Sequence, residues 1–598
     1  MSIVAADLST RASTGVFDRI RISAAARGWA TLLLVLAACL PPLVVDLRER
    51  MPTSMENFAV VSARETWERQ RAGDGRAWLM PTLNGEPRIV KPPLVVWLNL
   101  LAWFDLDPAT CSTADLTERA RGVAIGHGVL MLAGVFWLGL TLGDLRLAVL
   151  AALFTGSTVF FVRQARTASY DIVLAAWSTH AIAAALAAMR PLGPPRSAIA
   201  RVACWLAAAL ALGMAWLAKG PVALAVVGLP VAAAIVLMPS ERFINALFVA
   251  GCALAGSLPA LLWHAYVWRT LPDASRRLAS DYARVLNENY PFCYYLNLLA
   301  LALPWTLWLL VGVVLPFNAI DSGRRRVVLV PWCWLALLFV FFSIPAYKAQ
   351  RYMVPVLPAV ALLAGQAWLE YGARRRDGTL SRLMKIVQRL HDCGVAGAPI
   401  LFGLYLLAQN CLIARGWLKQ TMLHVAAWPQ GVLAFAAMLG LAVVACRSSF
   451  AVQPVRAAVA AALMAVMACM LSQRAGESRE PRVLELEAAR VIDRVGAAPL
   501  RYLATGSAAR RPSVEFLLHS RRVVPPVAPS ELSGYRATAP RVFVMASSDE
   551  ASDALLADAG FTAVLDLFDS RRWNRRLWQR DSPTDPERDS VASELFRP

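Results

Sequence analysis

Charged residues are scarce in this sequence. Asp, Glu, Lys and Arg together make up 17% of the 598 residues, whereas hydrophobic residues make up 58%. A soluble globular protein has about 25% charged and roughly 45–50% apolar residues. The shortage of charge excludes an intrinsically disordered chain and a collagen, and argues against ordinary soluble domains. The composition, with a mean hydropathy of +0.50, predicts a polytopic membrane protein.

The usual signatures of metal and redox sites are missing as well. The ten cysteines include no Cys-x-x-Cys pair, and most lie in apolar runs, where cysteine behaves as a small hydrophobic residue. The six histidines show no HxxxH or HxH spacing. The sequence therefore requires no cofactor and offers no ligand set to support a divalent metal.

Acidic residues are fewer than basic ones. The 41 Asp and Glu stand against 60 Lys and Arg, which gives a formal net charge of +19. Such an excess can indicate a nucleic-acid partner, but the chain has no zinc-finger spacing, basic helix or RNP-like aromatic strand. In a membrane protein the excess of Lys and Arg normally lies in cytoplasmic loops. We therefore expect membrane lipids, and no nucleic acid, as partners.

Long apolar runs dominate the first three quarters of the chain. A transmembrane helix needs about 20 apolar residues. Thirteen candidate spans lie at 28–45, 120–142, 146–163, 170–189, 200–218, 220–238, 245–268, 292–316, 326–344, 353–371, 394–414, 428–446 and 456–472. A further run, 92–104, is too short to span and is expected to form a juxtamembrane or re-entrant helix on the outer surface.

Basic residues between the spans set the expected orientation. With the N-terminus inside, the inner segments hold roughly twenty Lys and Arg, against about eleven in the short outer loops. The long loop 46–119 is left out of this comparison because long loops are translocated regardless of charge. The sequence thus predicts a multi-pass protein of a bacterial inner membrane, with a cytoplasmic N-terminus and a periplasmic C-terminus.

Composition divides the chain into three parts. Residues 1–27 form a basic cytoplasmic segment, and residues 28–472 form an all-α transmembrane domain that includes the outer loop 46–119. In residues 473–598, helix-like LELEAARVIDRV and SVEFLLH alternate with strand-like LRYLATG, RVFVMAS and TAVLDL. This alternation predicts a small periplasmic α/β domain. The polar stretch from residue 570 onward is expected to be loose.

Four groups of polar residues lie at the predicted outer ends of the spans. Ionisable groups in such places are costly and by default mark a site. The groups are Met55-Glu56 with Arg64-Glu65 and Lys91-Pro92-Pro93; Asp171 after Arg163 and Arg166; Lys219-Gly220-Pro221; and Lys348, Arg351 and Tyr352. Carboxylates and cations at one membrane face suit a reaction in which a phosphate departs and a hydroxyl loses its proton.

These residues, in this order, resemble the motifs of glycosyltransferase family 39, a group of membrane enzymes with the GT-C fold. The group includes protein O-mannosyltransferases and the aminoarabinose–lipid A transferase. The matching runs are Arg64-Glu65, Asn84-Gly85 with Lys91-Pro92-Pro93-Leu94, Asp171, Lys219-Gly220-Pro221, Pro291–Leu296 with Pro304-Trp305, and Arg351–Pro358. The resemblance covers residues 28–370. Beyond them the chain is similar to the family only in layout.

The resemblance implies a polyprenyl-phosphate sugar as donor, a hydroxyl of a protein, lipid or glycan as acceptor, and inversion at the anomeric carbon on the outer face. We expect the donor phosphate to be bound by Lys91, Lys219, Lys348, Arg351 and Tyr352.

Two acids of the family pattern are replaced in this chain. The family's first loop motif begins with Asp-Glu, where this chain has Met55-Glu56, and its acid before Lys-Pro-Pro is commonly Glu, where this chain has Val90. Glu56 and Asp171 remain as candidates for the catalytic base.

Several of these residues also have a structural interpretation. Lys91 can extend to lipid headgroups, Asp171 can stabilise the first turn of its helix, and Glu65 is expected to be structural. At the level of the whole protein, two rival functions stay open. One is a lipid or glycolipid transporter, and the other is a degenerate member that binds a lipid-linked sugar and acts as a scaffold.

Overall fold

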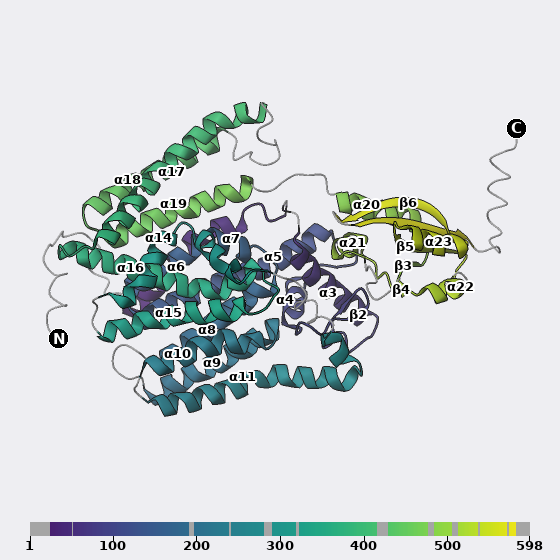
Figure 1. Cartoon of the computed structure of the whole chain (residues 1–598), viewed down its shortest axis with the longest axis horizontal. Helices are drawn as coiled ribbons and strands as arrows, with labels where there is room; N and C mark the ends of the chain where they lie inside the picture. Colours follow the sequence, from purple (N-terminus) through teal and green to yellow (C-terminus); the bar gives the residue numbers. More distant parts are fainter. Residues whose placement is uncertain are drawn as a thin grey trace.

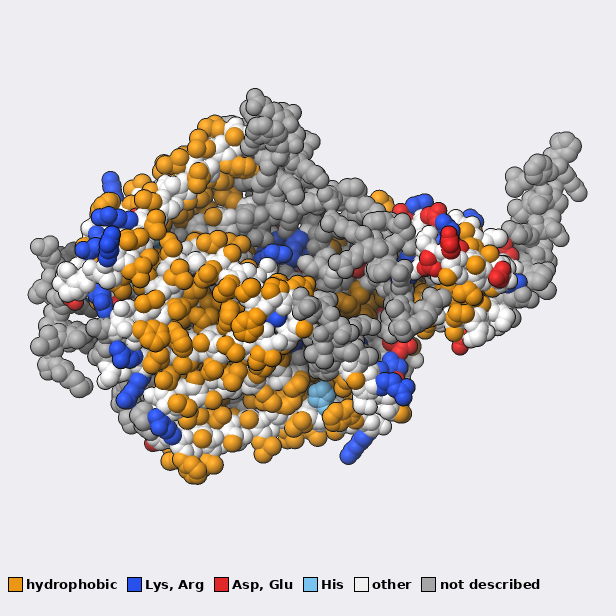
Figure 2. All heavy atoms as spheres, viewed as in Figure 1, with side chains coloured by type: hydrophobic (Ala, Val, Ile, Leu, Met, Phe, Trp, Pro, Cys, Tyr) orange, Lys and Arg blue, Asp and Glu red, His pale blue; other side chains and the backbone are white. Residues whose placement is uncertain are grey.

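The computed structural model describes residues 24–48, 50, 52–189, 197–238, 241–279, 290–318, 322–414, 428–475, 483–504, 512–535, 539–570 and 573–581. Most of them lie in helices that run alongside one another, and a small sheet with its own helices lies beyond one end of this helical body (Figure 1). Most of the predicted cytoplasmic segment 1–27 lies outside the described residues. Hydrophobic side chains cover much of the helical body (Figure 2).

Nine helices of the described residues are long and apolar enough to cross a membrane. They are α5 (Thr113–Leu142), α8 (Tyr170–Met189), α9 (Ala198–Lys219), α11 (Arg242–Thr270), α15 (Ser322–Ser343), α16 (Leu357–Arg376) with the preceding η4 (Gln350–Val356), α17 (Arg382–Ala414), α18 (Trp428–Phe450) and α19 (Pro454–Ala475). Each coincides with a predicted span, which confirms the all-α polytopic architecture.

The other four predicted spans are broken or short. The run 146–163 forms α6 (Leu145–Gly156) and α7 (Val159–Ala165), bent by 69°. The run 292–316 forms η2 (Phe292–Asn297) with α13 (Leu298–Leu301), then α14 (Thr306–Val314) with η3 (Leu315–Phe317), bent by 118°. The remaining two are α1 (Ala24–Cys39) and α10 (Val222–Leu237). The predicted count of thirteen is therefore reached only if each bent pair and both shorter helices cross.

The long loop between α1 and α5 is largely structured. After the short α2 (Pro41–Val44), it contains α3 (Ser54–Arg71), a hairpin of β1 (Thr82–Leu83) and β2 (Glu86–Pro87), and α4 (Leu94–Ala102), which is the short helix predicted within 92–104. Asn84 and Gly85 form the hairpin turn with φ of 57° and 76°, as the Asn-Gly pair favours.

Glu65 on α3 holds this hairpin in place. Its carboxylate accepts hydrogen bonds from Thr82 Oγ1 (2.7 Å), the Asn84 amide (2.7 Å) and the Gly85 amide (3.1 Å). These contacts support the predicted structural role of Glu65.

The C-terminal part contains a five-stranded mixed sheet in the order β4-β3-β5-β7-β6. The strands are β3 (Leu500–Leu503), β4 (Pro526–Val527), β5 (Arg541–Ser547), β6 (Thr562–Ser570) and β7 (Trp573–Asp581), with helices α20 (Val483–Val495), α21 (Val514–Ser520), α22 (Leu532–Tyr535) and α23 (Glu550–Asp558). The predicted α/β character is confirmed.

The expectation of a loose stretch from residue 570 onward is wrong for residues 573–581. They form β7, which pairs antiparallel with β5 on one side and β6 on the other. Leu577 is fully buried, and Trp578 is buried on the opposite face of the sheet. The strand was not predicted from the sequence, because the charged arginines next to these residues give the segment the composition of an exposed loop. Residues 582–598 lie outside the described part of the chain.

The sheet domain is docked on the outer loop through buried contacts. The Asn84 side chain donates to Val524 O (2.7 Å) and accepts from Val524 N (2.6 Å). The Arg64 guanidinium donates to the carbonyls of Leu517 and Leu518, each at 3.3 Å. Val60 and Val61 of α3 belong to the same apolar core as residues of α20 and α21. The loop motif and the C-terminal domain therefore form one packed unit.

Candidate active site

Asp171 at the start of α8 is the centre of a buried polar cluster. Its Oδ1 accepts a hydrogen bond from Lys219 Nζ at the end of α9, and its Oδ2 lies 3.4 Å from Arg351 Nε in η4. The side chain of Asp171 is 4% exposed and that of Lys219 is 10% exposed. The facing ends of α8 and α9, together with η4, thus place a carboxylate and two cations at one end of the helical body.

Tyr352 completes this cluster. Lys219 Nζ lies 4.1 Å from the centroid of its ring, and Arg351 Cζ lies 5.2 Å from the same point. Both distances are within the range of a cation–π interaction. Arg351 also donates to the hydroxyl of Tyr347 (3.2 Å). Four predicted site residues, Asp171, Lys219, Arg351 and Tyr352, are therefore brought together.

Lys91 lies next to this cluster, between the hairpin and α4. A Cβ added at Gly220, the residue after Lys219, would lie 4.0 Å from Pro92 Cδ. The pKa of Lys91 is lowered to about 7, chiefly because burial penalises the ammonium, and further because Lys219 is positive. Asp171 acts in the opposite direction but does not outweigh the two.

Arg88 is a cation of this region that the sequence analysis missed. Its Cζ lies 4.5 Å from the centroid of the Phe58 ring and 5.6 Å from that of Tyr170, and it donates to Phe58 O (3.2 Å). It also contributes to the lowered pKa of Lys91. The sequence feature that could have indicated a role for Arg88 is its position three residues before Lys91. With Arg88, the described residues of the cluster comprise four cations around a single carboxylate, Asp171, so positive charge is in excess among them.

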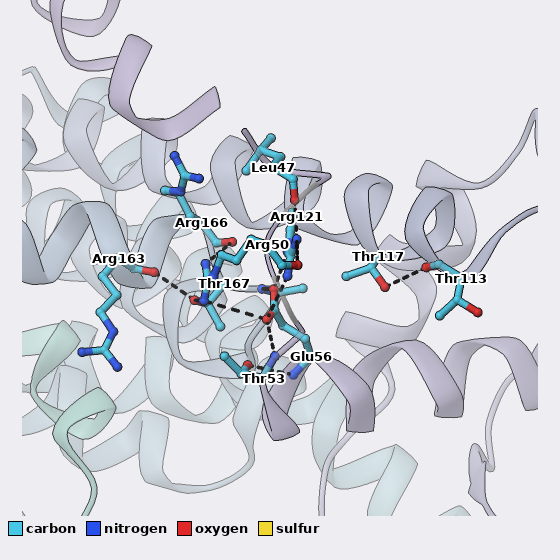
Figure 3. Close-up of polar contacts among 11 residues, drawn as sticks. Leu47, Arg50, Thr53, Glu56, Thr113, Thr117, Arg121, Arg163, Arg166 and Thr167 are labelled. Atoms are coloured by element: carbon cyan, nitrogen blue, oxygen red, sulfur yellow. Dashed lines mark hydrogen bonds and ion pairs between the residues drawn. The ribbon is translucent and has the colours of Figure 1, made fainter. Parts of the chain in front are cut away.

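Glu56 is fully buried, and its carboxylate has partners on both oxygens (Figure 3). Oε1 lies 2.7 Å from Arg121 Nε and accepts from the Ala168 amide (3.3 Å), and Oε2 accepts from the Thr53 amide (2.7 Å). Burial would raise the pKa of Glu56, but Arg121, with help from Arg50 and Thr53, outweighs burial and keeps the pKa below its ordinary value. The geometry therefore does not support Glu56 as the base.

The partly buried Arg50 and the fully buried Arg166 hold the segment that leads to Asp171 (Figure 3). Arg50 donates to Arg166 O (3.2 Å) and to Thr167 Oγ1 (3.0 Å), and Arg166 donates to Pro42 O (2.8 Å). Together with the Glu56–Ala168 contact, these bonds fix the turn between α7 and α8. Arg50 and Arg121 were not predicted, because neither the loop residue Arg50 nor Arg121, near the start of a predicted apolar span, differs in the sequence from an arginine that faces solvent.

Lys348 is not brought into the cluster. Its ammonium donates to Pro345 O (2.7 Å) and Tyr290 O (3.3 Å), and the residue is 4% exposed. Tyr295 binds the next residue: its hydroxyl donates to Ala349 O (3.3 Å) and accepts from Ala349 N (3.2 Å). The geometry gives Lys348 a role in shaping the loop before Arg351, in place of the predicted contact with phosphate.

No group of three or more His, Cys, Asp or Glu that could hold a metal ion is found in the described part of the chain. The part of the cluster that the structure describes contains cations, one carboxylate and a phenol, which can bind an anion and accept a proton.

This arrangement of apolar helices, a structured first loop, an extramembrane sheet domain and a polar cluster at helix ends defines a membrane protein with the GT-C fold. The structure of ArnT from Cupriavidus metallidurans bound to undecaprenyl phosphate is similar over 93% of this chain and 98% of that one, with a TM-score of 0.63 and 18% identity. No protein-family model matches the chain.

Similarity in sequence to curated relatives shows which kind of enzyme the chain resembles. The undecaprenyl phosphate-alpha-4-amino-4-deoxy-L-arabinose arabinosyl transferase 1 of Sodalis glossinidius is 29% identical over 390 residues, which cover 62% of this chain and 64% of that protein. The transferase of the same name from Serratia proteamaculans is 26% identical over 444 residues, which cover 70% and 72%. These matches confirm the predicted resemblance. The matched part spans slightly less than two thirds of the Sodalis protein. The apolar helices and these relatives indicate a multi-pass protein of the inner membrane.

Proposed function

We propose that this protein is a membrane glycosyltransferase that moves a sugar from a polyprenyl-phosphate donor to a hydroxyl acceptor, with inversion, on the outer face of the inner membrane. The N-terminus is cytoplasmic and the sheet domain periplasmic in this proposal. The observation that carries it is the cluster of Lys91, Lys219 and Arg351 around Asp171 at one end of the helical body. The names of the curated relatives support an undecaprenyl-phosphate sugar, such as aminoarabinose, as the donor class to test first.

The cations bind the donor phosphate in this mechanism. Lys91, Lys219 and Arg351 supply positive charge where the phosphate leaves, and charge placed in advance in a water-poor site stabilises the transition state most effectively. Tyr352 orients Lys219 and Arg351 through its ring. Arg88 adds charge from the first loop.

Asp171 is the proposed base. Because its carboxylate is paired with cations, its ability to accept a proton depends on whether the donor is bound. Before the donor binds, Lys219 and Arg351 occupy both of its oxygens. A phosphate competes for the same two cations and so exposes the carboxylate to the acceptor hydroxyl. Asp171 then accepts the hydroxyl proton as the oxygen attacks the anomeric carbon and the polyprenyl phosphate departs. Proton transfer is thereby reserved for the state in which the donor is in place.

A second candidate function is a scaffold that binds a lipid-linked sugar without transferring it. Met55 and Val90 stand where the family has acids, and the remaining loop acid, Glu56, is held by Arg121. This leaves Asp171 as the one acid of the cluster within the described residues.

The deciding experiment measures donor consumption by the full chain in vesicles that contain a labelled undecaprenyl-phosphate sugar. Loss of a general base costs about 10²–10⁴ in rate. We expect Asp171→Asn to reduce kcat by about 100-fold or more while donor binding is kept, because the cations remain. Asp105→Asn, which removes the exposed partner of Arg119, is the matched control. Donor binding without consumption by the unsubstituted protein would favour the scaffold.

A further inference from the structure

A cavity lined by polar and apolar residues lies at the end of the helical body opposite Asp171. Helix α16 begins beside the cluster, directly after Tyr352 and η4, and ends at Arg376 after 20 residues. At 1.5 Å per residue these residues span about 30 Å, which is the thickness of a bilayer core. The cavity has a volume of about 720 Å³ and is lined by α6, α15, α16, α19 and the turn between α18 and α19.

Arginines from four separate elements converge on this cavity. They are Arg146, Arg324, Arg376 and Arg456. Figure 2 shows Lys and Arg side chains gathered along this end of the molecule, away from the sheet domain.

Little negative charge opposes these arginines. The lining carboxylate, Asp144, caps its own helix by accepting from the Arg146 and Leu147 amides (2.9 and 3.0 Å), and its other oxygen lies 3.9 Å from Arg146 Nε. Arg324 is paired with Glu370 at 2.7 Å. Arg376 and Arg456 have no ion-pair partner among the described residues.

One wall of the cavity is a constrained turn. Val452 has a φ of 56°, a conformation that a β-branched residue rarely adopts, and its amide donates to Ser449 O (3.2 Å). Pro454 lies two residues further along the same wall. Its carbonyl oxygen accepts a hydrogen bond from Trp368 Nε1 (2.7 Å) on α16. These contacts fix this wall of the cavity, whereas the side chains of Arg146, Arg376 and Arg456 are exposed.

The floor of the cavity is apolar. This apolar part of the lining consists of Leu369 and Ala373 of α16 and Val459 of α19. An acyl chain fits such a surface, and guanidinium groups bind phosphate through paired hydrogen bonds. The known excess of basic residues on the cytoplasmic side explains arginines at this end, but it does not explain their convergence on a preformed cavity.

We propose that this cavity binds an anionic phospholipid of the cytoplasmic leaflet, with the headgroup phosphate among Arg146, Arg376 and Arg456 and the first part of an acyl chain on the apolar floor. Basic pockets between transmembrane helices on this side of a membrane are suited to such headgroups. The proposal is independent of the transfer reaction, because α16 separates the cavity from Asp171 by about the thickness of the bilayer core.

The test compares phospholipid binding to the purified full chain by native mass spectrometry with phosphatidylglycerol or phosphatidylcholine, and repeats it with inorganic phosphate as competitor. Each arginine near an anionic headgroup contributes about fivefold in affinity, so Arg376→Gln with Arg456→Gln should weaken phosphatidylglycerol binding by about 30-fold. Arg382→Gln with Lys385→Gln, two exposed cations outside the cavity on α17, is the control and should leave binding unchanged.

Three results would overturn the proposal. They are equal retention of the two lipids by the unsubstituted protein, equal losses in the cavity and control variants, and displacement of phosphatidylglycerol by millimolar inorganic phosphate, which would assign the cavity to a soluble anion. Arg376→Lys with Arg456→Lys keeps both charges and should retain most of the binding. A loss in this variant equal to that of the glutamine variant, with folding intact by size exclusion, would show that charge is not what the cavity recognises.

Discussion

Asp171 and Lys219 form a buried ion pair across the facing ends of α8 and α9, although 48 residues separate them in the sequence. Arg351 approaches the same carboxylate from a third segment, so three parts of the chain meet at one acid.

Removing one member of this pair should be more damaging than removing both. A buried charge left without its partner costs about 3–5 kcal/mol, whereas replacing a pair by apolar groups is often nearly neutral. We expect Lys219→Met to lower the free energy of unfolding by about 3 kcal/mol, and Asp171→Asn with Lys219→Met to recover about half of that loss. Thermal or denaturant unfolding in detergent measures both. Additive effects of the two changes would show that the pair is not coupled.

Lys91 should make donor binding dependent on pH. Its pKa of about 7 lies far below the ordinary 10.5, so the ammonium is lost as the pH rises through neutrality. We expect the affinity for undecaprenyl phosphate to fall by about tenfold between roughly pH 6 and 8.5. Arginine stays protonated in this range, and Lys91→Arg should therefore remove the dependence. An unchanged slope in Lys91→Arg would assign the titration to another group.

The same group affects stability with the opposite sign. Because the pKa of Lys91 is lower in the folded chain than in the unfolded chain, the unfolded chain binds more protons between about pH 7 and 10.5, and stability rises with pH across that window. Lys91→Met should flatten this part of the curve of unfolding free energy against pH. Lys385→Met, at an exposed position on α17, should leave it as it is.

Glu56 should matter for folding more than for chemistry. Glu56→Gln keeps the size of the side chain but leaves Arg121 buried without a counter-charge, which costs about 3–5 kcal/mol. We expect a lower yield and melting temperature, whereas the folded fraction keeps the pH profile of transfer. Adding Arg121→Met should restore part of the stability. A normally stable Glu56→Gln protein with kcat reduced by about 1,000-fold would identify Glu56 as the base.

Asn84 should control how firmly the sheet domain is held. Asn84→Ala removes both hydrogen bonds to Val524 and places alanine at a φ of 57°, which asparagine tolerates better. We expect faster amide exchange at residues 512–527, by about tenfold or more, with the helical body unaffected. Asn318→Ala, at an exposed position after η3, is the control. Equal exchange in the two variants would show that the sheet domain is held elsewhere.

The sequence predicted the membrane helices and five of the six residues that the structure brings together around Asp171, with Arg88 as the exception. Apolar runs report burial in lipid directly, and Asp171, Lys219, Arg351 and Tyr352 stood out because polar residues at the ends of such runs are costly. Their convergence followed from placing them all on one face of the membrane. The 118° bend between α13 and α14 was not visible, because hydropathy records composition and not direction.

The loop residues were harder to interpret. Glu56, Arg50 and Arg121 are joined by tertiary contacts between segments that are 65 or more residues apart or lie on either side of a turn, and no periodic pattern announces such contacts. Lys348 has the residue type of a phosphate ligand but turns to the carbonyls of Pro345 and Tyr290. The charge of a residue therefore does not distinguish a side chain that binds a ligand from one that holds a loop in place.

The hairpin of β1 and β2 joins two distant parts of the protein. The side chain of Asn84 at its tip forms two hydrogen bonds with the backbone of Val524. The hairpin ends four residues before Lys91. A displacement of the sheet domain would therefore reach the segment that carries Lys91 through a stretch of only four residues.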